Sequence, residues 1–380
     1  IILLLANPLV YSQNEWAYST PSELGFNVSI LNEFENEINE GKFGYIDSML
    51  IIRDEKIAFQ KSYEHNYNKI YNKEANTPGP LVVNDPSGPY NYFNSWWHPY
   101  YQKTELHTMQ SVTKSIVSAI IGIAIARNEF PNLNTPVMSF FDSSKIANVD
   151  ARKNSITLEN LLTMTTGLDW DEDLPYNDPN NTFTIMARDP DWIQYTLDRP
   201  MIKNPGESFQ YNSGATLILG HIFRLATGID LEEYALKYLF TPLGINNYFW
   251  KRTPMGLVDT QEGLFISSLD IAKISQLYLN NGKWEESQII PETWIQESIS
   301  PKVSVVSNKS IEYGYKWWLY NYEYQGQKYT AFAGAGFGGQ RPIVLPEFNI
   351  VIVFTGWNIL PNRPNLTTEV AISRIVEAIE

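Results

Sequence analysis

The chain has 380 residues, of which 43% are hydrophobic, and its formal net charge is -14. This is enough apolar sequence for the core of one large domain, or of two domains that share a core. The acidic excess argues against nucleic acid or an anionic membrane as a partner, because phosphate groups are bound by basic surfaces. The chain has no cysteine, which excludes disulfides, thiolate zinc sites and a cysteine nucleophile.

Metal chemistry is not expected either. The chain has only four histidines, and none of them has the spacing of a metal-binding pair. They are His65, His98, His107 and His221. We therefore expect neither a metal hydrolase nor a cofactor.

The N-terminal segment is strongly apolar. It reads "IILLLANPLV" and is followed by small and polar residues. This pattern is typical of the apolar part of a secretory signal peptide, and the run is too short to span a bilayer. We interpret residues 1–15 as a signal-peptide remnant and expect a periplasmic or secreted protein whose mature chain is not inserted in the membrane. The alternative is an ordinary N-terminal strand or helical turn.

The next hundred residues combine a helix, a hairpin and a long loop. Leu31, Phe34 and Ile38 have helical spacing, and two apolar runs around "RDEK" predict a hairpin in the segment 46–63. Residues 64–108 are rich in asparagine, proline and aromatic residues, and this aromatic density argues against disorder.

The middle of the chain is nearly all helical, and strands return near the end. The candidate helices are residues 111–127, 157–165, 214–226, 231–240, 268–280 and 292–298. Three further strands are expected between residues 313 and 357, and a closing helix over residues 366–380.

This order predicts an α+β fold with one antiparallel sheet of about five strands, built from both chain ends and flanked by helices. A mostly helical domain is inserted into it. We expect a single domain over residues 20–380, with a sheet subdomain (20–108 and 300–380) and a helical subdomain (109–299).

A serine and a lysine open the most apolar helix. Ser111 and Lys114 are three residues apart and therefore lie on one face of a helix, so their side chains can meet. A buried lysine is costly unless its charge is paired or its pKa falls, and a neutral amine can take the proton of a serine. The spacing alone is also compatible with an ordinary structural role, because one Ser-x-x-Lys is expected by chance in a chain of this length.

Two further elements have possible chemical roles. Tyr211 precedes another apolar helix and can act as a proton shuttle if nearby cations lower its pKa from about 10. The segment "FAGAGFGGQ" is rich in glycine inside a strand pattern, which indicates the close approach of another backbone or of a ligand. The alternatives are a packed tyrosine at a helix start and a β-bulge.

Together these elements resemble a known family. "SVTK" from Ser111, "YNS" from Tyr211 and "GAG" from Gly334 resemble, in order and spacing, the motifs of the serine β-lactamase and penicillin-binding-protein superfamily. The most similar branch is that of the class C β-lactamase-related esterases and 6-aminohexanoate-oligomer hydrolases. The resemblance covers nearly the whole chain from about Thr20, including "LENLLTMTTGLDW" and "SSLDIAKISQLYLNNGKW".

The resemblance implies a set of roles. Ser111 would be the nucleophile that forms an acyl-enzyme, and Lys114 and Tyr211 would form a coupled acid/base pair. The backbone N–H groups of Ser111 and Phe337 would form the oxyanion hole. Because protons in such a group are shared, the choice of base between Lys114 and Tyr211 stays open. The substrate would be contacted by Ser213, Gly334, Ala335 and Gly336.

Two departures from the family pattern bear on the substrate. Ser213 stands where β-lactamases usually have asparagine, and Gly334 stands where they have lysine or often histidine. The second change removes a cation from the place where a β-lactam or peptide carboxylate would bind. Arg341 or Lys328 would have to replace it, and both are also compatible with solvated strand positions. The departures favour an esterase or amidase over a penicillin hydrolase.

The long loop and an acidic stretch supply the last candidates. Trp96 and Trp97, together with neighbouring tyrosines, lie just before the nucleophile and would wall an apolar acyl pocket, or else seal the loop to the body. The acidic "DWDEDLPYNDPN" that follows Leu168 is interpreted as facing water, with the cleft as the alternative.

We thus expect a serine hydrolase that cleaves a small-molecule ester or amide through an acyl-serine. One alternative is a β-lactamase or D-alanyl-D-alanine carboxypeptidase. Another is a catalytically silent module that binds peptidoglycan or a glycan. An α/β-hydrolase is not expected, because the chain lacks the Gly-x-Ser-x-Gly pentapeptide.

Overall fold

The computed structural model describes residues 16–82, 85, 87–305 and 310–380. The expected signal-peptide remnant, residues 1–15, lies outside this part of the chain. Within the described residues, none of the helices has the length and apolar character needed to cross a membrane.

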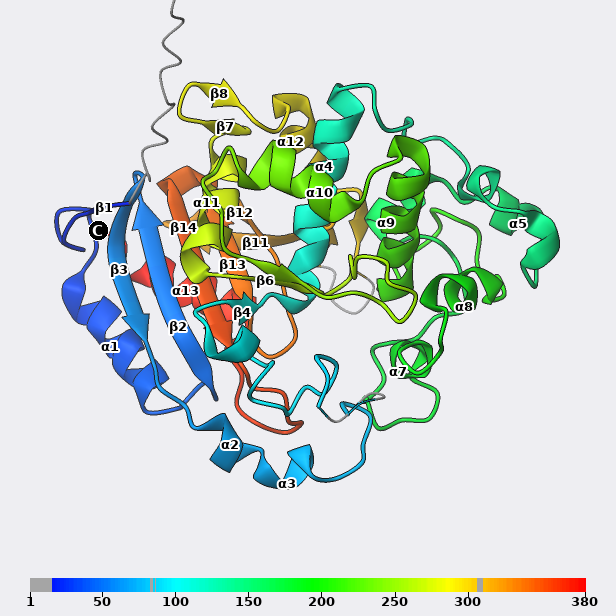
Figure 1. Cartoon of the computed structure of the whole chain (residues 1–380). Coiled ribbons are helices and arrows are strands. Elements are labelled where there is room, and N and C mark those ends of the chain that lie inside the picture. The colour runs from blue at the N-terminus through cyan, green and yellow to red at the C-terminus, as the bar shows by residue number, and fades with distance from the viewer. Residues whose placement is uncertain (1–15, 83–84, 86, 306–309) are drawn as a thin grey trace, which may run out of the picture.

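The largest element of the described chain is a nine-stranded sheet that joins both chain ends (Figure 1). Within it, β14 from the C-terminal part pairs with β2 from the N-terminal part. Neighbouring strands are antiparallel, except that β1 runs parallel to β3. In sheet order the strands are β1 (Ala17–Tyr18), β3 (Lys56–Ser62), β2 (Ile46–Arg53), β14 (Ile350–Gly356), β13 (Arg341–Leu345), β12 (Gln327–Ala333), β11 (Trp318–Tyr324), β10 (Ile311–Tyr313) and β9 (Val303–Ser304).

The predicted fold class is confirmed, but the predicted count of about five strands is wrong. The C-terminal part supplies four long strands instead of three, because glycines between β12 and β13 break the backbone there. Gly338 and Gly339 have φ angles of +86° and +115°, a region that side chains rarely adopt. The remaining strands have two or three residues, too few to show an alternating pattern in sequence.

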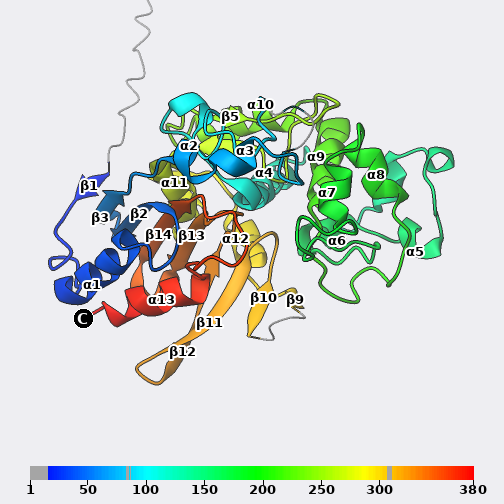
Figure 2. The ribbon, with the colours of Figure 1, turned by 90° about the horizontal axis from the view of Figure 1, so that it is seen from below.

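Helices cover both faces of the sheet. α1 (Val28–Asn39) and α13 (Thr368–Glu377) lie side by side on one face, and α11 (Ser268–Leu279) lies on the other (Figure 2). Successive residues of β14 supply the two faces in turn: Ile350, Ile352 and Phe354 pack with α1 and α13, whereas Val351 and Val353 pack on the side of α11. Because a shift of β14 by one residue would exchange these two sets of side chains, their alternation fixes the register of β14 against its neighbours.

The rest of the chain forms the helical region beside the sheet (Figure 1). Its helices are α4 (Thr113–Ala126), α5 (Ala151–Asn154), α6 (Leu158–Thr163), α7 (Thr182–Met186), α8 (Trp192–Asp198), α9 (Ser213–Thr227), α10 (Leu231–Ala235) and α12 (Glu292–Ser298). The short helices α2 (Tyr67–Ile70) and α3 (Asn72–Ala75) lie in the long loop. Small sheets are formed by β4 (His107–Thr108), β6 (Leu264–Ile266) and β5 (Phe249–Trp250), and by β7 (Lys283–Trp284) with β8 (Ser287–Gln288).

Each predicted helix of this region is present; α12 has the predicted ends, and the others are shifted. Thr157 caps α6 through a reciprocal capping box with Asn160. The helix ends at Thr163 rather than 165, because Met164 takes a left-handed conformation with φ +59°. The predicted helix 231–240 consists of α10 followed by a π-helical turn, Leu236–Phe240.

Candidate active site

Ser111 lies in a short 3₁₀ turn, Gln110–Val112, that joins β4 to α4. The α-helix therefore begins two residues later than predicted, and the serine sits just before its N-terminus. Gln110 has a φ angle of +49°, a strained conformation for a residue with a side chain. Its side-chain amide donates to the Thr108 hydroxyl at 2.8 Å, which helps to hold this conformation.

Lys114 contacts the serine directly. Its Nζ donates to Ser111 Oγ at 2.8 Å and to the carbonyl oxygen of Gln261 at 3.0 Å. The same atom lies 5.0 Å from the centre of the Tyr211 ring. Since Lys114 is only 1% exposed, these contacts are what compensates for the loss of water around its amine.

Tyr211 completes the group from the segment before α9. Asn212 caps that helix by accepting from the Ala215 amide at 3.0 Å, and the Tyr211 ring stacks on Trp318 with the ring centres 5.7 Å apart. Burial raises the pKa of Tyr211, although Lys114 and hydrogen bonds with Ser111 and Lys114 act in the opposite direction. The net shift is therefore upward, not the lowering expected from neighbouring cations, and the phenol stays protonated at neutral pH.

The glycine-rich segment after β12 lies against the 3₁₀ turn that carries Ser111, the candidate nucleophile turn. A Cβ placed on Gly336 would lie 2.5 Å from the backbone oxygen of Met109, and one on Gly334 would lie 3.3 Å from side-chain atoms of Val112. The close approach inferred from the sequence is therefore an approach of backbone to backbone. It places Phe337, the next residue, beside the turn that carries Ser111.

Ser213 is bound to an acidic residue that the sequence analysis did not single out. Its backbone N–H and its hydroxyl both donate to the Glu172 carboxylate at 2.8 Å, and Trp170 Nε1 donates to the same carboxylate at 2.6 Å. Asp171 and Asp173 are exposed, as the solvent-facing interpretation of this stretch predicts, but Glu172 is half-buried. Burial raises the pKa of Glu172, and the positive charge of Lys114 opposes this rise.

The structure does not bring Trp96 or Trp97 into contact with the three motif residues. Trp96 is 45% exposed, with the Lys103 amine 5.0 Å from its ring. Trp97 packs on Tyr101 and Phe249. A substrate role for the two tryptophans stays a prediction that these contacts do not support.

Other aromatic residues surround Phe337 instead. Its ring makes edge contacts with Tyr176 at 4.9 Å, Tyr92 at 6.2 Å and Trp357 at 6.3 Å between ring centres. Tyr92 belongs to the long loop, so part of the aromatic loop does reach the neighbourhood of the third motif. The aromatic side chains of this cluster pack on one another, and Tyr92 and Trp357 are buried.

Neither proposed replacement cation contacts the motif residues. Arg341 Nε donates to the Leu366 carbonyl at 2.7 Å, and Lys328 is exposed on β12. Ala335 lies between the two closely packed glycines. In the described part of the chain, no cluster of three or more histidine or acidic side chains could hold a metal ion.

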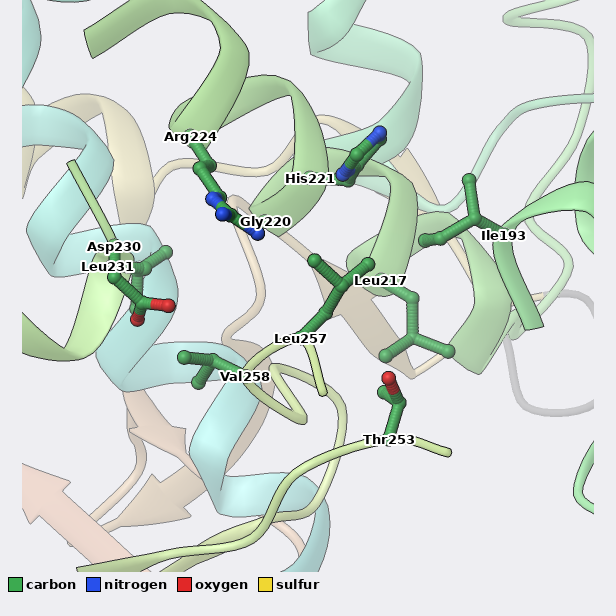
Figure 3. A pocket seen from close by; sticks show the side chains of 10 residues that line it. All are labelled: Ile193, Leu217, Gly220, His221, Arg224, Asp230, Leu231, Thr253, Leu257 and Val258. Carbon is green, nitrogen blue, oxygen red and sulfur yellow. The ribbon is translucent and has the colours of Figure 1, made fainter. Parts of the chain in front are cut away.

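A small cavity between α9 and the loop around residues 253–258 is separate from this site (Figure 3). His221 and Arg224 project from α9 beside it, and its volume is about 10 Å³, the space of about one water molecule. None of Ser111, Lys114 and Tyr211 lines it. The cavity is therefore not a candidate substrate site.

Comparisons with known proteins show the family of this chain. Residues 91–356 match the Beta-lactamase family. Monacolin J acid methylbutanoyltransferase of Aspergillus terreus is 33% identical over 124 residues, which is 32% of this chain and 30% of that enzyme. The chain thus matches less than a third of the length of this curated relative.

Solved structures establish the fold over nearly the whole chain. A candidate 6-aminohexanoate-dimer hydrolase from Bacillus anthracis has a TM-score of 0.66 and 18% identity, over 96% of this chain and 86% of that one. A hydrolase with promiscuous acyltransferase activity has a TM-score of 0.67 and 14% identity, over 94% and 98% of the two chains. The resemblance drawn from the sequence motifs is confirmed, because the matched family segment contains all three motifs.

Proposed function

The chain belongs to the beta-lactamase family, and on this premise we propose that it is a serine hydrolase that cleaves ester or amide bonds through an acyl-serine intermediate. The observation that carries the proposal is the 2.8 Å contact between Lys114 Nζ and Ser111 Oγ, beside the Tyr211 ring. A base in hydrogen-bond reach of a serine is the arrangement that activates it as a nucleophile.

The steps follow from these positions. Ser111 Oγ attacks the substrate carbonyl while its proton passes to the group formed by Lys114 and Tyr211. That group then protonates the leaving alcohol or amine, and later takes a proton from the water that hydrolyses the acyl-serine. Because Tyr211 is protonated at rest, its role is to relay a proton between Lys114 and the leaving group. The N–H groups of Ser111 and Phe337 stabilise the oxyanion.

The substrate proposed here is a small molecule without a carboxylate next to the scissile bond. Gly334 packs on Val112 and Pro342 in place of the family cation, and Arg341 and Lys328 make their contacts elsewhere. These facts disfavour a β-lactamase or a D-alanyl-D-alanine carboxypeptidase. The contact between nucleophile and amine disfavours a catalytically silent binding module.

Acyl transfer to an alcohol is a second candidate. The observation that favours it is the 33% identity with a methylbutanoyltransferase over 124 residues. Transfer uses the same acyl-serine and differs only in the second step, in which an alcohol replaces water as the acceptor.

The first experiment measures turnover by the wild type and Ser111→Ala. The panel contains short p-nitrophenyl esters, a chromogenic cephalosporin, a D-Ala-D-Ala peptide and a linear ω-amino-acid amide, each with and without an added alcohol. We expect ester or amide turnover that Ser111→Ala loses by at least about 10³-fold. No turnover, together with no labelling of Ser111 by a fluorophosphonate, would contradict the proposal.

Export is proposed on the composition of residues 1–15 alone. Fractionation of cells that produce the full chain tests it, and recovery of the unprocessed chain only from the cytoplasm would contradict it.

A further inference from the structure

We propose that Glu172 is a positioning residue of the active site: it anchors the start of α9 behind Tyr211 and supplies the negative charge that faces Lys114. The proposal rests on the proposed acyl-serine chemistry. Glu172 lies outside the three motifs, in the connection between α6 and α7.

Hydrogen bonds hold the Glu172 carboxylate in one orientation. Both of its oxygens accept hydrogen bonds: Oε1 from the Ser213 hydroxyl, and Oε2 from the Ser213 N–H and from Trp170 Nε1. Three donors on one carboxylate favour its charged form and fix its orientation. The Ser213 N–H is at the N-terminus of a helix of 15 residues, where the helix dipole also favours a negative charge.

The residue that Glu172 anchors, Ser213, lies close to Tyr211 in the chain. Ser213 is two residues after Tyr211, so the hydrogen bonds to Glu172 fix the backbone on which the phenol is carried. The intervening residue, Asn212, donates its N–H to Met164 Sδ at 3.4 Å, which ties the same turn to the end of α6. A shift of Glu172 would therefore move Tyr211 relative to Lys114.

Two buried lysines, Lys114 and Lys316, interact electrostatically with the Glu172 carboxylate. Burial raises the pKa of Glu172, and the positive charge of Lys114 on α4 opposes this rise. Burial also raises the pKa of Tyr211, and the charge of Glu172 adds to that rise. A second buried lysine, Lys316, precedes β11 and also faces this region. Burial and the nearby Lys114 hold the pKa of Lys316 well below its usual range, and its Nζ donates to the Leu161 carbonyl at 2.6 Å. Lys316 therefore does not compete with Lys114 for the carboxylate.

The other titratable groups nearby carry no opposing positive charge. Tyr313 of β10 and Tyr176 of the same connection as Glu172 both have pKa values well above 10, chiefly because they are buried, and stay neutral. Asp171 and Asp173 flank Glu172 in sequence but are exposed to solvent. Glu172 is thus the carboxylate that three hydrogen bonds hold at the start of α9, two residues from Tyr211. A negative charge at this position sets the pH range in which the coupled group takes the serine proton.

The experiment compares Glu172→Gln, Glu172→Asp and the matched control Asp173→Asn, an exposed neighbour. The pH profile of kcat/KM is measured for a p-nitrophenyl ester, and the rate of Ser111 labelling by a fluorophosphonate is measured in parallel. Removal of a negative charge lowers the pKa of the coupled group, so the acidic limb of the Glu172→Gln profile is expected about one pH unit below that of the wild type. Its plateau is expected to fall about tenfold, because a charge-assisted anchor is lost. Asp173→Asn is expected to match the wild type.

Glu172→Asp keeps the charge and shortens the anchor. Its acidic limb is expected at the wild-type position with a lowered plateau, and this variant decides the matter if Glu172→Gln does not fold. The proposed effect of the Glu172 charge would be overturned if the Glu172→Gln profile had a lowered plateau but an acidic limb at the wild-type pH. It would also be overturned if the acidic limb moved in Glu172→Asp, which keeps the charge. A wild type that neither turns over the ester nor labels at Ser111 would refute the proposed function itself, a result distinct from failure of the Glu172 proposal alone.

Discussion

Gly336 lies where the end of β12 meets the nucleophile turn, and space rather than backbone conformation requires glycine there. Its backbone is not in the left-handed region, yet a Cβ would lie 2.5 Å from the Met109 backbone oxygen. A backbone oxygen cannot rotate away as a flexible side chain can, so the two segments would have to separate. Since Phe337 and Ser111 lie on these segments, their separation would widen the proposed oxyanion hole.

Gly336→Ala is therefore expected to lower kcat/KM for the preferred ester at least about tenfold, with a loss of stability of about 1–3 kcal/mol from overpacking. The control is Gly79→Ala, because Gly79 has open space around its Cβ position, with only Thr77 oxygen 3.9 Å away. Steady-state kinetics and denaturant unfolding measure the two effects. Equal kinetics for the two variants would contradict the close-approach interpretation.

Among single residues, the sequence predicted those whose partners are a few positions away in the chain. Ser111 and Lys114 meet as their separation of three residues requires, whereas Glu172 was not recognised. It stands between two aspartates that are exposed, and a run of acidic residues normally faces water. Its inward orientation depends on Ser213, which is 41 residues away in the chain. Such a long-range partner leaves no local periodic signal.

At the scale of elements, α4 shows how packing overrides helix propensity. Gly122 lies in the middle of this helix, where alanine would ordinarily be favoured by about 1 kcal/mol. The Trp294 ring of α12 lies over it, and a Cβ at Gly122 would be 2.2 Å from a ring atom. The indole is almost fully buried, at 7% exposure, and has little freedom to move.

Gly122→Ala is accordingly expected to destabilise the protein by about 1–2 kcal/mol, because overpacking outweighs the gain in propensity. The double variant Gly122→Ala/Trp294→Leu makes room for the methyl group, so its destabilisation should be smaller than the sum of the two single effects. Denaturant unfolding of the wild type, the two single variants and the double variant measures this coupling. Additive effects would show that the two side chains do not clash.

Predictability also differed among elements. Long helices were predicted because many residues contribute to their apolar periodicity, but their ends were shifted where a local backbone conformation intervened, as at Met164. The strands β9 and β10 were missed, since elements of two or three residues are formed by pairing with neighbours rather than by their own pattern.

For the molecule as a whole, a buried polar cluster connects the sheet to the nucleophile turn. Asp47 on β2 is 1% exposed and lies 2.9 Å from His107 Nε2, 3.2 Å from His65 Nδ1 and 2.7 Å from the Tyr67 hydroxyl. His107 belongs to β4, four residues before Ser111, and its Nδ1 lies 3.0 Å from the Thr108 carbonyl oxygen. Both ring nitrogens thus lie within hydrogen-bond distance of oxygen atoms.

This cluster links the stability of the sheet to pH. Burial alone would raise the pKa of Asp47, but hydrogen bonds from His107 and His65 outweigh it and lower the pKa below its ordinary value of 3.8. A depressed carboxyl pKa contributes stability that is fully present above 3.8 and is lost as the pH falls through the lower folded value.

Asp47→Asn is therefore expected to cost about 3 kcal/mol at neutral pH, because the hydrogen-bonding groups of His107, His65 and Tyr67 lose the carboxylate that they contact. The difference from the wild type should shrink as the pH falls below 3.8, where the wild-type carboxyl also becomes neutral. Asp54→Asn is the matched control: Asp54 is exposed in the turn that follows β2, and its loss should cost within about 0.5 kcal/mol. Denaturant unfolding of the three proteins across acid and neutral pH measures these differences. If Asp47→Asn is no less stable than Asp54→Asn at neutral pH, the cluster does not hold the nucleophile turn to the sheet.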